Sequence, residues 1–342
     1  MFTRRRFLKG ALGAGAGLTL AAQGSHRAAA QTAATHAQRN KELVLRLKKS
    51  QGTVENETVM RETLAPGYKR LRGGMSNLAA NARDQGFPDA GLNLRGAIPD
   101  RVDVIEESIA EGDLVGLIWR ITGTHRGNLF GIPPTGKPVD VYEMGVWRVT
   151  DGKITEAWFM VDEAGLLKQL GAKLPPRKDG QLIAPPVTGA GEDPDAVLRR
   201  LEAGPLVTTE DRNRLMVARS KGSAPPQGDR AADYKQRRFG FQHLRDYGIA
   251  RNVANQNITA SLPGRRDRID GFIAEGEKVW MRFKLAGIHG APLYGLAPTG
   301  KPVEIPELGV MRIVDGKWKE SWYFGDELGL LLQLNALHML EN

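Results

Sequence analysis

Apolar residues follow two different periods in each half of the chain. Leu43, Val44 and Leu47 recur at helical spacing within 40–49, and 211–220 repeats that pattern later. From Val102 onward apolar and polar residues alternate, which predicts strands, with a turn at 111–113 and a long strand over 114–125. Short helices are expected at 163–170 and 327–334. A helix lying on a curved antiparallel sheet is an α+β layout, with room for a cavity between the two.

The turns between the later strands have a clear local chemistry. Asp151-Gly152 and Asp315-Gly316 lie between apolar strands, which predicts two-residue hairpins.

Segments 131–137 and 295–301 fit the G-x4-G-K frame of a phosphate-binding loop. Pro138 and Pro302 follow them, however, where a magnesium-binding Ser or Thr is needed. We interpret both segments as strand connections and expect no nucleotide binding.

The chain of 342 residues contains one unit twice. Segments 123–172 and 287–336 align without a gap, and 27 of their 50 positions are identical. A unit of about 130 residues is long enough to bury its own core, so the repeat indicates a domain duplication. We expect one domain over 36–172, a linker rich in Pro, Gly and charge over 173–193, and a second domain over 194–342.

The N-terminus has the layout of an export signal. Arg4, Arg5 and Arg6 precede a short Gly/Ala-rich apolar run over 11–22, and Ala28-Ala29-Ala30 form a small-residue cleavage site. Residues 1–30 therefore resemble a twin-arginine signal peptide. The expectation is export through the twin-arginine pathway to the periplasm or the exterior. The run is too short and too rich in glycine for a stable membrane anchor.

Composition and charge narrow the chemistry. The signal carries five basic residues and no acidic ones, so removing it lowers the formal charge from +9 to +4, and basicity no longer argues for nucleic acid. The chain has no cysteine, which excludes disulfides, thiolate nucleophiles and iron–sulfur clusters. With only six histidines, we expect no histidine-rich metal site.

Strand alternation selects the candidate site residues. Trp119 shares one face of the long strand with His125, and the second copy places His289 in the same way. On a later strand, alternate residues end in an aspartate next to apolar neighbours, and we expect them on an interior face. These are Glu156, Trp158 and Asp162, with Glu320, Trp322 and Asp326 in the second copy.

A carboxylate at the edge of an aromatic-lined cavity loses hydration, which raises its pKa and suits it to proton transfer. Other interpretations stay open. Asp162 and Asp326 directly precede the closing helices and can be N-caps. Glu156 and Glu320 can pair with arginines such as Arg148 and Arg312. The histidines can be satisfied core residues.

The strings GTHRGNLFGIPPTGKPV and GVWRVTDGKITEAWFMVDEAGLLKQLG resemble the SnoaL-like polyketide/ester cyclase family, as do Phe87-Pro88-Asp89 and the turn at 109–113. The second copy matches less well, because it lacks the Phe-Pro-Asp element and has Ile288 and Gly290 around its histidine. The resemblance implies two tandem cone-shaped α+β barrels of the nuclear-transport-factor-2-like type, forming an intramolecular pseudo-dimer and leaving higher oligomers open.

The resemblance also implies an activity. Characterised cyclases of the family close a ring by an intramolecular aldol reaction without metal or organic cofactor. Asp162 and Asp326 match the position of the acid/base, and His125 and His289 would polarise a carbonyl or orient the acid. Trp119, Glu156, Trp158, Glu320 and Trp322 would then contact a small apolar substrate.

Three hypotheses follow for the function. The first is a cofactor-independent cyclase or isomerase that acts by enolisation. The second is a non-catalytic periplasmic binder of small hydrophobic ligands, because many members of this superfold bind without chemistry. The third, epoxide hydrolysis, requires an Asp–Arg–Asp set, and the pattern places no arginine inside.

Overall fold

The computed structural model describes residues 35–87, 94–175, 191–223 and 228–340. The expected signal peptide, most of the expected linker, and Pro88 and Asp89 lie outside these residues. Within the described part of the chain, no helix is both long and apolar enough to span a membrane.

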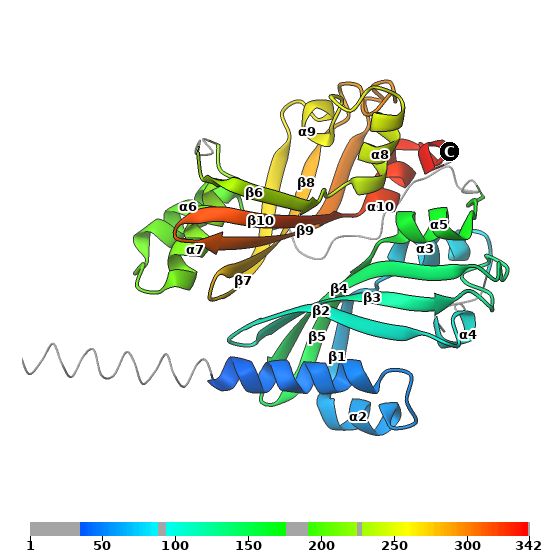
Figure 1. The fold of residues 1–342 in the computed structure, drawn as a ribbon, viewed down its shortest axis with the longest axis horizontal. Coiled ribbons are helices and arrows are strands. Elements are labelled where there is room, and N and C mark those ends of the chain that lie inside the picture. Colours follow the sequence, from blue (N-terminus) through cyan, green and yellow to red (C-terminus); the bar gives the residue numbers. More distant parts are fainter. Residues whose placement is uncertain (1–34, 88–93, 176–190, 224–227, 341–342) are drawn as a thin grey trace, which may run out of the picture.

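The first unit is a five-stranded mixed sheet with helices on one side (Figure 1). A helix over 35–50 precedes the other elements, and the sheet order is β1-β5-β4-β3-β2. Strand β1 pairs with β5 in parallel, and the other neighbours are antiparallel. The elements are α2 Asn56–Thr63, β1 Leu64–Arg72, α3 Ser76–Asp84, α4 Leu94–Ala97, β2 Val102–Glu111, β3 Leu114–Thr124, β4 Pro138–Thr150, β5 Lys153–Val161 and α5 Glu163–Leu170.

The second unit repeats this architecture, with sheet order β6-β10-β9-β8-β7 and a parallel β6–β10 pair. The duplication and the α+β class are confirmed, while the parallel edge strands make each sheet mixed where an antiparallel one was expected. The elements are α6 Pro194–Ala203, α7 Thr209–Arg219, β6 Arg230–Arg238, α8 Gln242–Ala250, α9 Ile258–Ser261, β7 Arg266–Glu275, β8 Lys278–Ile288, β9 Pro302–Val314, β10 Lys317–Gly325, α10 Glu327–Leu334 and the 3-10 helix Leu337–Leu340.

The predicted turns are confirmed. Asp151 and Gly152 both have positive φ, 50° and 71°, as a type I′ hairpin requires, and Asp315 and Gly316 do the same. Strand β4 begins at Pro138, directly after segment 131–137. This segment therefore lies between strands β3 and β4, and no helix follows it.

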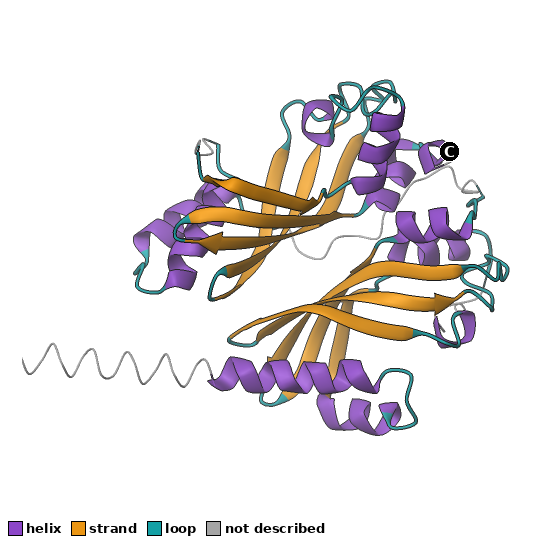
Figure 2. Ribbon diagram, viewed as in Figure 1, coloured by secondary structure: helices purple, strands orange, loops and turns teal. Residues whose placement is uncertain are grey.

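Each sheet has two apolar faces. The interior face packs on the unit's own helices and includes Val115, Leu117, Trp119 and Ile121, as the alternation predicts. The other face, the inter-unit face, packs against the second sheet, so that the two units form an intramolecular pseudo-dimer (Figure 2). Its buried residues are Ile109, Ile118, Met144, Val146, Trp158, Met160, Ile273, Trp280, Leu308, Val310 and Phe324.

A bulge in β5 changes which residues share a face. Ile154 pairs with Val149 and Glu156 pairs with Arg148, so Thr155 is an extra residue in the ladder. After the bulge, the interior core contains Ala157, Phe159 and Val161 together with Ile154. Strand β10 is irregular at the same place, between Trp318 and Glu320.

Candidate functional site

Four charged side chains meet inside the first unit. Lys48 comes from the helix over 35–50, Arg101 and Asp103 from the start of β2, and Glu143 from β4. Lys48 Nζ lies 2.5 Å from Asp103 Oδ2, and Arg101 Nε lies 2.7 Å from Asp103 Oδ1. Arg101 Nη2 also lies 3.5 Å from Glu143 Oε2. We call these four residues the interior cluster.

Aromatic rings form one wall of the interior cluster. The Nζ atom of Lys48 lies 3.6 Å from the ring centroid of Trp119, a cation–π contact. Trp119 in turn packs against Trp147 and Phe159, with ring centroids 5.9 and 6.4 Å away. The predicted interior position of Trp119 is confirmed, and its ring shields the charged groups from water.

Two groups of the interior cluster have pKa values shifted toward neutral pH. Burial raises the pKa of Glu143, and Lys48 and Arg101 only partly offset this effect. Burial also lowers the pKa of Lys48 to about 8, against the opposing charges of Glu143 and Asp103. Both shifts move the groups toward neutral pH, where proton transfer is effective.

A cavity of about 280 Å³ gives access to Glu143. The backbone of Gly74 passes so close to this carboxyl group that a Cβ at Gly74 would overlap Oε1 of Glu143. Glycine is therefore the residue that lets the chain approach the carboxyl group. The other lining residues are Arg70, Gly73, Met75, Ser76, Ala79, Arg83, Leu94 and Phe130.

The second unit repeats the interior cluster with Lys221, Arg265, Asp267 and Glu307. Lys221 Nζ lies 2.8 Å from Asp267 Oδ2 and 3.5 Å from the ring centroid of Phe283, which takes the place of Trp119. Burial raises the pKa of Glu307 to about 7. The surroundings differ, because Tyr323 stands where the first unit has Phe159, and Gln236 where it has Arg70.

The two predicted histidines bind the loops over 131–137 and 295–301 through hydrogen bonds. His125 is fully buried, and its Nδ1 accepts a hydrogen bond from the Thr135 backbone N–H at 3.3 Å and lies 3.1 Å from Thr135 Oγ1. His289 makes the same contacts with Thr299. Burial lowers the pKa of both histidines. Nε2 of each ring is buried without a hydrogen-bond partner among the residues that the structure describes, so the alternative of satisfied core residues holds only for Nδ1, and a catalytic role stays a prediction.

The two predicted aspartates lie between the units. Asp162 Oδ1 accepts the Gly165 N–H at 2.9 Å, and Asp326 caps α10 through Gly329 in the same way, so the N-cap interpretation is confirmed. Arg238 of the second unit lies 2.9 Å from Asp162 Oδ2. Burial favours a higher pKa for Asp162, but Arg238 and His243 outweigh it and hold the pKa well below its usual range. A role of Asp162 as acid/base stays a prediction.

The remaining four predicted residues do not lie on the interior face. Trp158 belongs to the inter-unit core. Trp322 packs against this core, where its ring contacts that of Tyr142. Glu156 pairs with Arg148 at 3.3 Å, as one alternative proposed, and Glu320 pairs with Arg237 at 2.7 Å. The interior placement is wrong because the bulges shift the alternation by one residue. Their role in substrate binding stays a prediction.

The interior cluster itself was missed, although the repeat contained a signal for it. Arg101-x-Asp103 recurs as Arg265-x-Asp267, and Glu143 recurs as Glu307 within otherwise apolar strands. A charged residue kept at the same place in both copies of a buried strand indicates a partner inside the fold.

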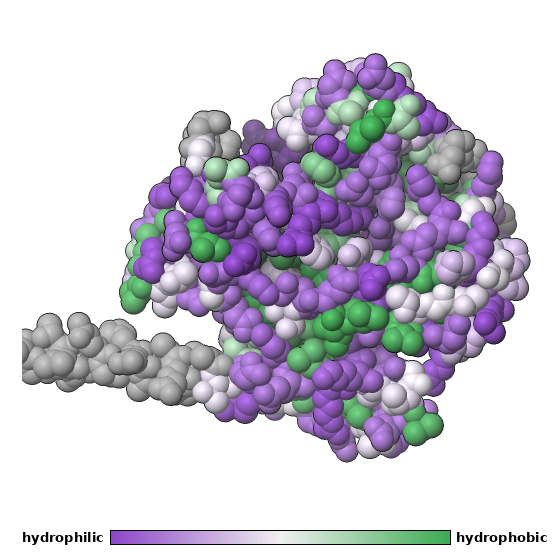
Figure 3. Space-filling view, viewed as in Figure 1, coloured by the Kyte–Doolittle hydropathy of each residue, from purple (hydrophilic) through white to green (hydrophobic). Residues whose placement is uncertain are grey.

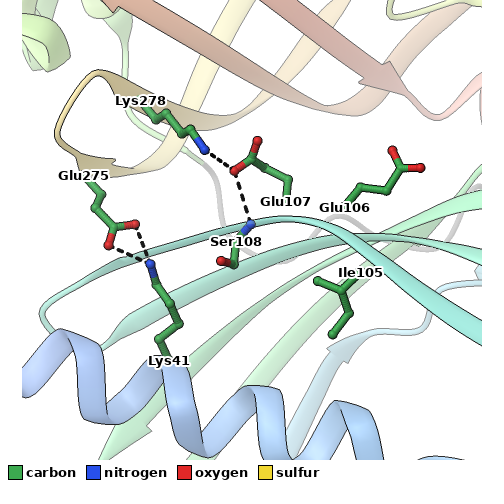
Figure 4. A pocket seen from close by; sticks show the side chains of 7 residues that line it. All are labelled: Lys41, Ile105, Glu106, Glu107, Ser108, Glu275 and Lys278. Atoms are coloured by element: carbon green, nitrogen blue, oxygen red, sulfur yellow. Dashed lines mark hydrogen bonds and ion pairs between the residues drawn. The ribbon is translucent and has the colours of Figure 1, made fainter.

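A wider hollow, of about 510 Å³, lies where the units meet (Figure 4). In it Lys41 lies 2.6 Å from Glu275, and Lys278 pairs with Glu107, each pair joining the two units. We interpret it as a seam of ion pairs. The surrounding surface is mainly hydrophilic, with a hydrophobic patch over the first unit (Figure 3).

Comparisons with known proteins agree with the duplication. Residues 75–170 and 240–334 each match the family model described as SnoaL-like polyketide cyclase. A proposed SnoaL-like polyketide cyclase from Jannaschia sp. CCS1 is 26% identical, with 40% of this chain and 95% of that chain covered and a TM-score of 0.33. IdmH, a proposed polyketide cyclase from Streptomyces antibioticus, is 26% identical, with coverages of 39% and 99% and a TM-score of 0.32. An NTF2-like protein from Burkholderia thailandensis E264 is 19% identical, with coverages of 39% and 98% and a TM-score of 0.29. No curated protein matches the chain.

Proposed function

The chain belongs to the SnoaL-like polyketide cyclase family, and we propose that it carries out cofactor-independent acid–base cyclisation or isomerisation of a small apolar carbonyl compound inside its first unit. One observation carries this proposal. A buried carboxyl group with a raised pKa, Glu143, lines a cavity and has the cations Lys48 and Arg101 beside it.

The reaction needs three functions, and the interior cluster supplies each of them. Glu143 as carboxylate takes the α-proton of the carbonyl compound, which leaves an enolate. The positive charges of Lys48 and Arg101 stabilise the negative charge that develops on oxygen. In a cyclisation the enolate carbon attacks a second carbonyl of the same molecule, and the proton held on Glu143 returns to the new alkoxide. In an isomerisation the proton returns to another carbon of the enolate system.

The geometry favours Glu143 over Asp162 as the group that exchanges the proton. Both Asp162 oxygens are engaged, one by the Gly165 N–H and the other by Arg238. A carboxylate held ionised in this way is a weak base and a poor acid near neutral pH. Glu143 has the opposite pKa shift and faces a cavity.

Deuterium exchange tests the proposal without knowledge of the natural substrate. The protein is incubated in deuterium oxide with a panel of aryl ketones and keto esters that carry enolisable α-hydrogens, and mass spectrometry follows the α-position. We expect catalysed exchange for a subset of the panel. Binding of panel members without exchange above the rate in buffer would contradict an enolising enzyme.

A non-catalytic binder of small hydrophobic ligands is the second candidate. A further cavity of about 370 Å³ adjoins the first, since Phe130 lines both, and its wall includes Phe87, Ile132 and Leu174. Such a mainly apolar space suits a hydrophobic ligand. Mass spectrometry of the natively purified protein separates the candidates: an unmodified ligand supports the binder, and a cyclised product supports the enzyme.

Epoxide hydrolysis also has a specific observation in its favour. Arg101 lies inside the first unit between two carboxyl groups, Asp103 and Glu143, so it forms a set like the Asp–Arg–Asp set of this reaction with a glutamate in place of one aspartate. Hydrolysis of a terpene or aryl epoxide in 18O-labelled water would give a singly labelled diol. The absence of such a diol over a panel of epoxides would rule against this reaction.

A further inference from the structure

Two pairs of carboxyl groups lie where the units meet, and all of them except Asp162 are buried. One pair is Asp326 with Glu163, and the other is Asp162 with Glu327, so each pair takes one residue from each unit. Each aspartate caps a closing helix and pairs with an arginine of the opposite unit. The duplication thus produces two equivalent half-sites.

In the first half-site every carboxyl oxygen has a hydrogen-bond donor. The Asn77 amide donates to both residues, with Nδ2 at 2.6 Å from Glu163 Oε2 and 2.7 Å from Asp326 Oδ1. The Leu78 N–H satisfies Glu163 Oε1 at 2.8 Å, and Arg72 satisfies Asp326 Oδ2 at 2.8 Å. The two N–H groups of one amide therefore hold two carboxylates together.

In the second half-site, His243 stands where the first has Asn77. Its Nε2 lies 3.0 Å from Asp162 Oδ2 and 4.0 Å from Glu327 Oε2. A ring nitrogen carries a single proton, and the Nε2–H donates it in a hydrogen bond to Asp162, which leaves none for Glu327. Glu327 Oε1 accepts the Leu244 N–H at 2.9 Å, but Oε2 has no hydrogen-bond partner although the side chain is only 1% exposed. An unpaired buried carboxyl oxygen is costly, so this half-site lacks a positively charged partner.

We propose that the second half-site binds a divalent transition-metal cation, with zinc as the best fit, through Asp162, His243 and Glu327. One ligand atom from each of these residues lies within 4.8 Å of the others. One imidazole and two carboxylates form a donor set that zinc accepts. On binding, the neutral ring keeps its one proton on Nδ1, and Nε2 ligates the ion. Two carboxylates and Arg238 leave one net negative charge for the cation to offset. The 22% exposure of His243 leaves a route for the ion and for a water ligand.

This site has a different role from the interior cluster. Asp162 belongs to the first unit, while His243 and Glu327 belong to the second, so a bound ion joins the two units. Zinc contributes here to the stability of the pseudo-dimer. The site departs from the expectation of no metal, since its three ligands come from distant parts of the chain and no sequence spacing connects them.

The first unit supplies the matched control for the test. His243→Asn installs the amide that the first half-site already uses, so this variant should stay folded. After dialysis against a limited zinc concentration, elemental analysis should find one zinc per wild-type chain and none per His243→Asn chain. A chelator should lower the Tm of the wild type and leave that of the variant unchanged. Equal zinc content in the two proteins would overturn the proposal.

A converse variant tests whether the histidine is the reason that only the second half-site binds zinc. Asn77→His creates the second half-site's arrangement in the first, so this chain should bind two zinc ions. A single ion in this variant would contradict the equivalence of the half-sites. A wild-type chain that takes up no zinc, with Glu327→Gln raising its stability above pH 7, would show that a proton is the missing partner, and the proposal would fail.

Discussion

At the scale of single residues, the same functional group has opposite properties at two places. Glu143 is buried and Asp162 is mostly shielded from solvent, yet the pKa of Glu143 is raised and that of Asp162 is lowered. Burial dominates at Glu143, whereas a close arginine, a histidine and a helix N–H group outweigh burial at Asp162. Strand alternation in the sequence selects Asp162 but not Glu143, and it does not show the partners of Asp162, because Arg238 and His243 lie about 80 residues further along the chain.

The raised pKa of Glu307 predicts a pH-dependent stability. The folded chain keeps this proton up to about pH 7, whereas the unfolded chain releases it near the ordinary value of 4.5. The contribution of Glu307 to the free energy of unfolding is therefore full below pH 4.5 and is lost as the pH rises to 7, an effect on the order of 3 kcal/mol. Glu307→Gln should flatten the dependence between these pH values in urea unfolding. The exposed Glu277→Gln is the control, and an unchanged pH profile in Glu307→Gln would contradict the assignment.

The close approach of Gly74 to Glu143 predicts a cost for any side chain at this position. Gly74→Ala places a methyl group against Glu143 Oε1 and 2.8 Å from Val161 Cγ2. We expect a loss of about 1–3 kcal/mol in the free energy of unfolding, with loss of catalysed exchange as the carboxyl group moves. Gly67→Ala is the control, because no atom lies within 4 Å of its Cβ. Equal stability of both variants would argue against this packing.

At the scale of elements, the sequence predicts most of the fold. The helical period of 211–220, the alternation over 114–125 and the Asp-Gly hairpins all correspond to elements of the structure. The alternation fails at Thr155, because one extra residue in the ladder moves the following side chains to the other face. The parallel strand β1 escapes prediction too, since its sequence, LAPGYKRLR, has no alternation.

The interior cluster shows the same limit of prediction from local sequence patterns. Its members come from a helix and two strands, and Lys48 and Glu143 are separated by 95 residues. Local periodicity cannot bring such residues together, because the sheet order decides which strands face which helix. The internal repeat is the signal that could have found them.

The packing of strands β3 and β8 across the inter-unit face gives a prediction for the pseudo-dimer. A Cβ at Gly116 would lie 2.5 Å from Cζ3 of Trp280 in the other unit. Gly116→Ala should therefore separate the sheets locally and lower the Tm, measured by circular dichroism. Gly204→Ala, whose Cβ would lie 3.5 Å from its nearest neighbour, is the control. A Tm of Gly116→Ala equal to that of the control would show that the sheets do not pack this closely.

In the whole molecule, the duplication places the cavity and the carboxylate pairs at different locations in one chain. The first unit has the cavity at Glu143, and both units contribute the carboxylates at their contact. Ion pairs between Lys41 and Glu275 and between Lys278 and Glu107 add to the apolar inter-unit core. We infer that the proposed catalysis and the proposed metal site fail independently in variants.

Export stays a prediction from the sequence of residues 1–30. Replacing Arg4 and Arg5 by lysine removes the pair that a twin-arginine receptor reads. We expect the uncleaved chain to accumulate in the cytoplasm, measured by fractionation and intact mass. Processing and export of this variant at the wild-type rate would contradict the twin-arginine assignment.

Comparison of two variants tests whether Glu143 exchanges the substrate proton. The rate of α-deuterium exchange is measured for Glu143→Gln and Asp162→Asn, with folding verified by circular dichroism. We expect the exchange rate of Glu143→Gln to fall by about 100- to 10,000-fold, the usual contribution of an acid–base group, and that of Asp162→Asn to fall by less than about tenfold. A Glu143→Gln protein that keeps its rate while Asp162→Asn loses it would contradict the account.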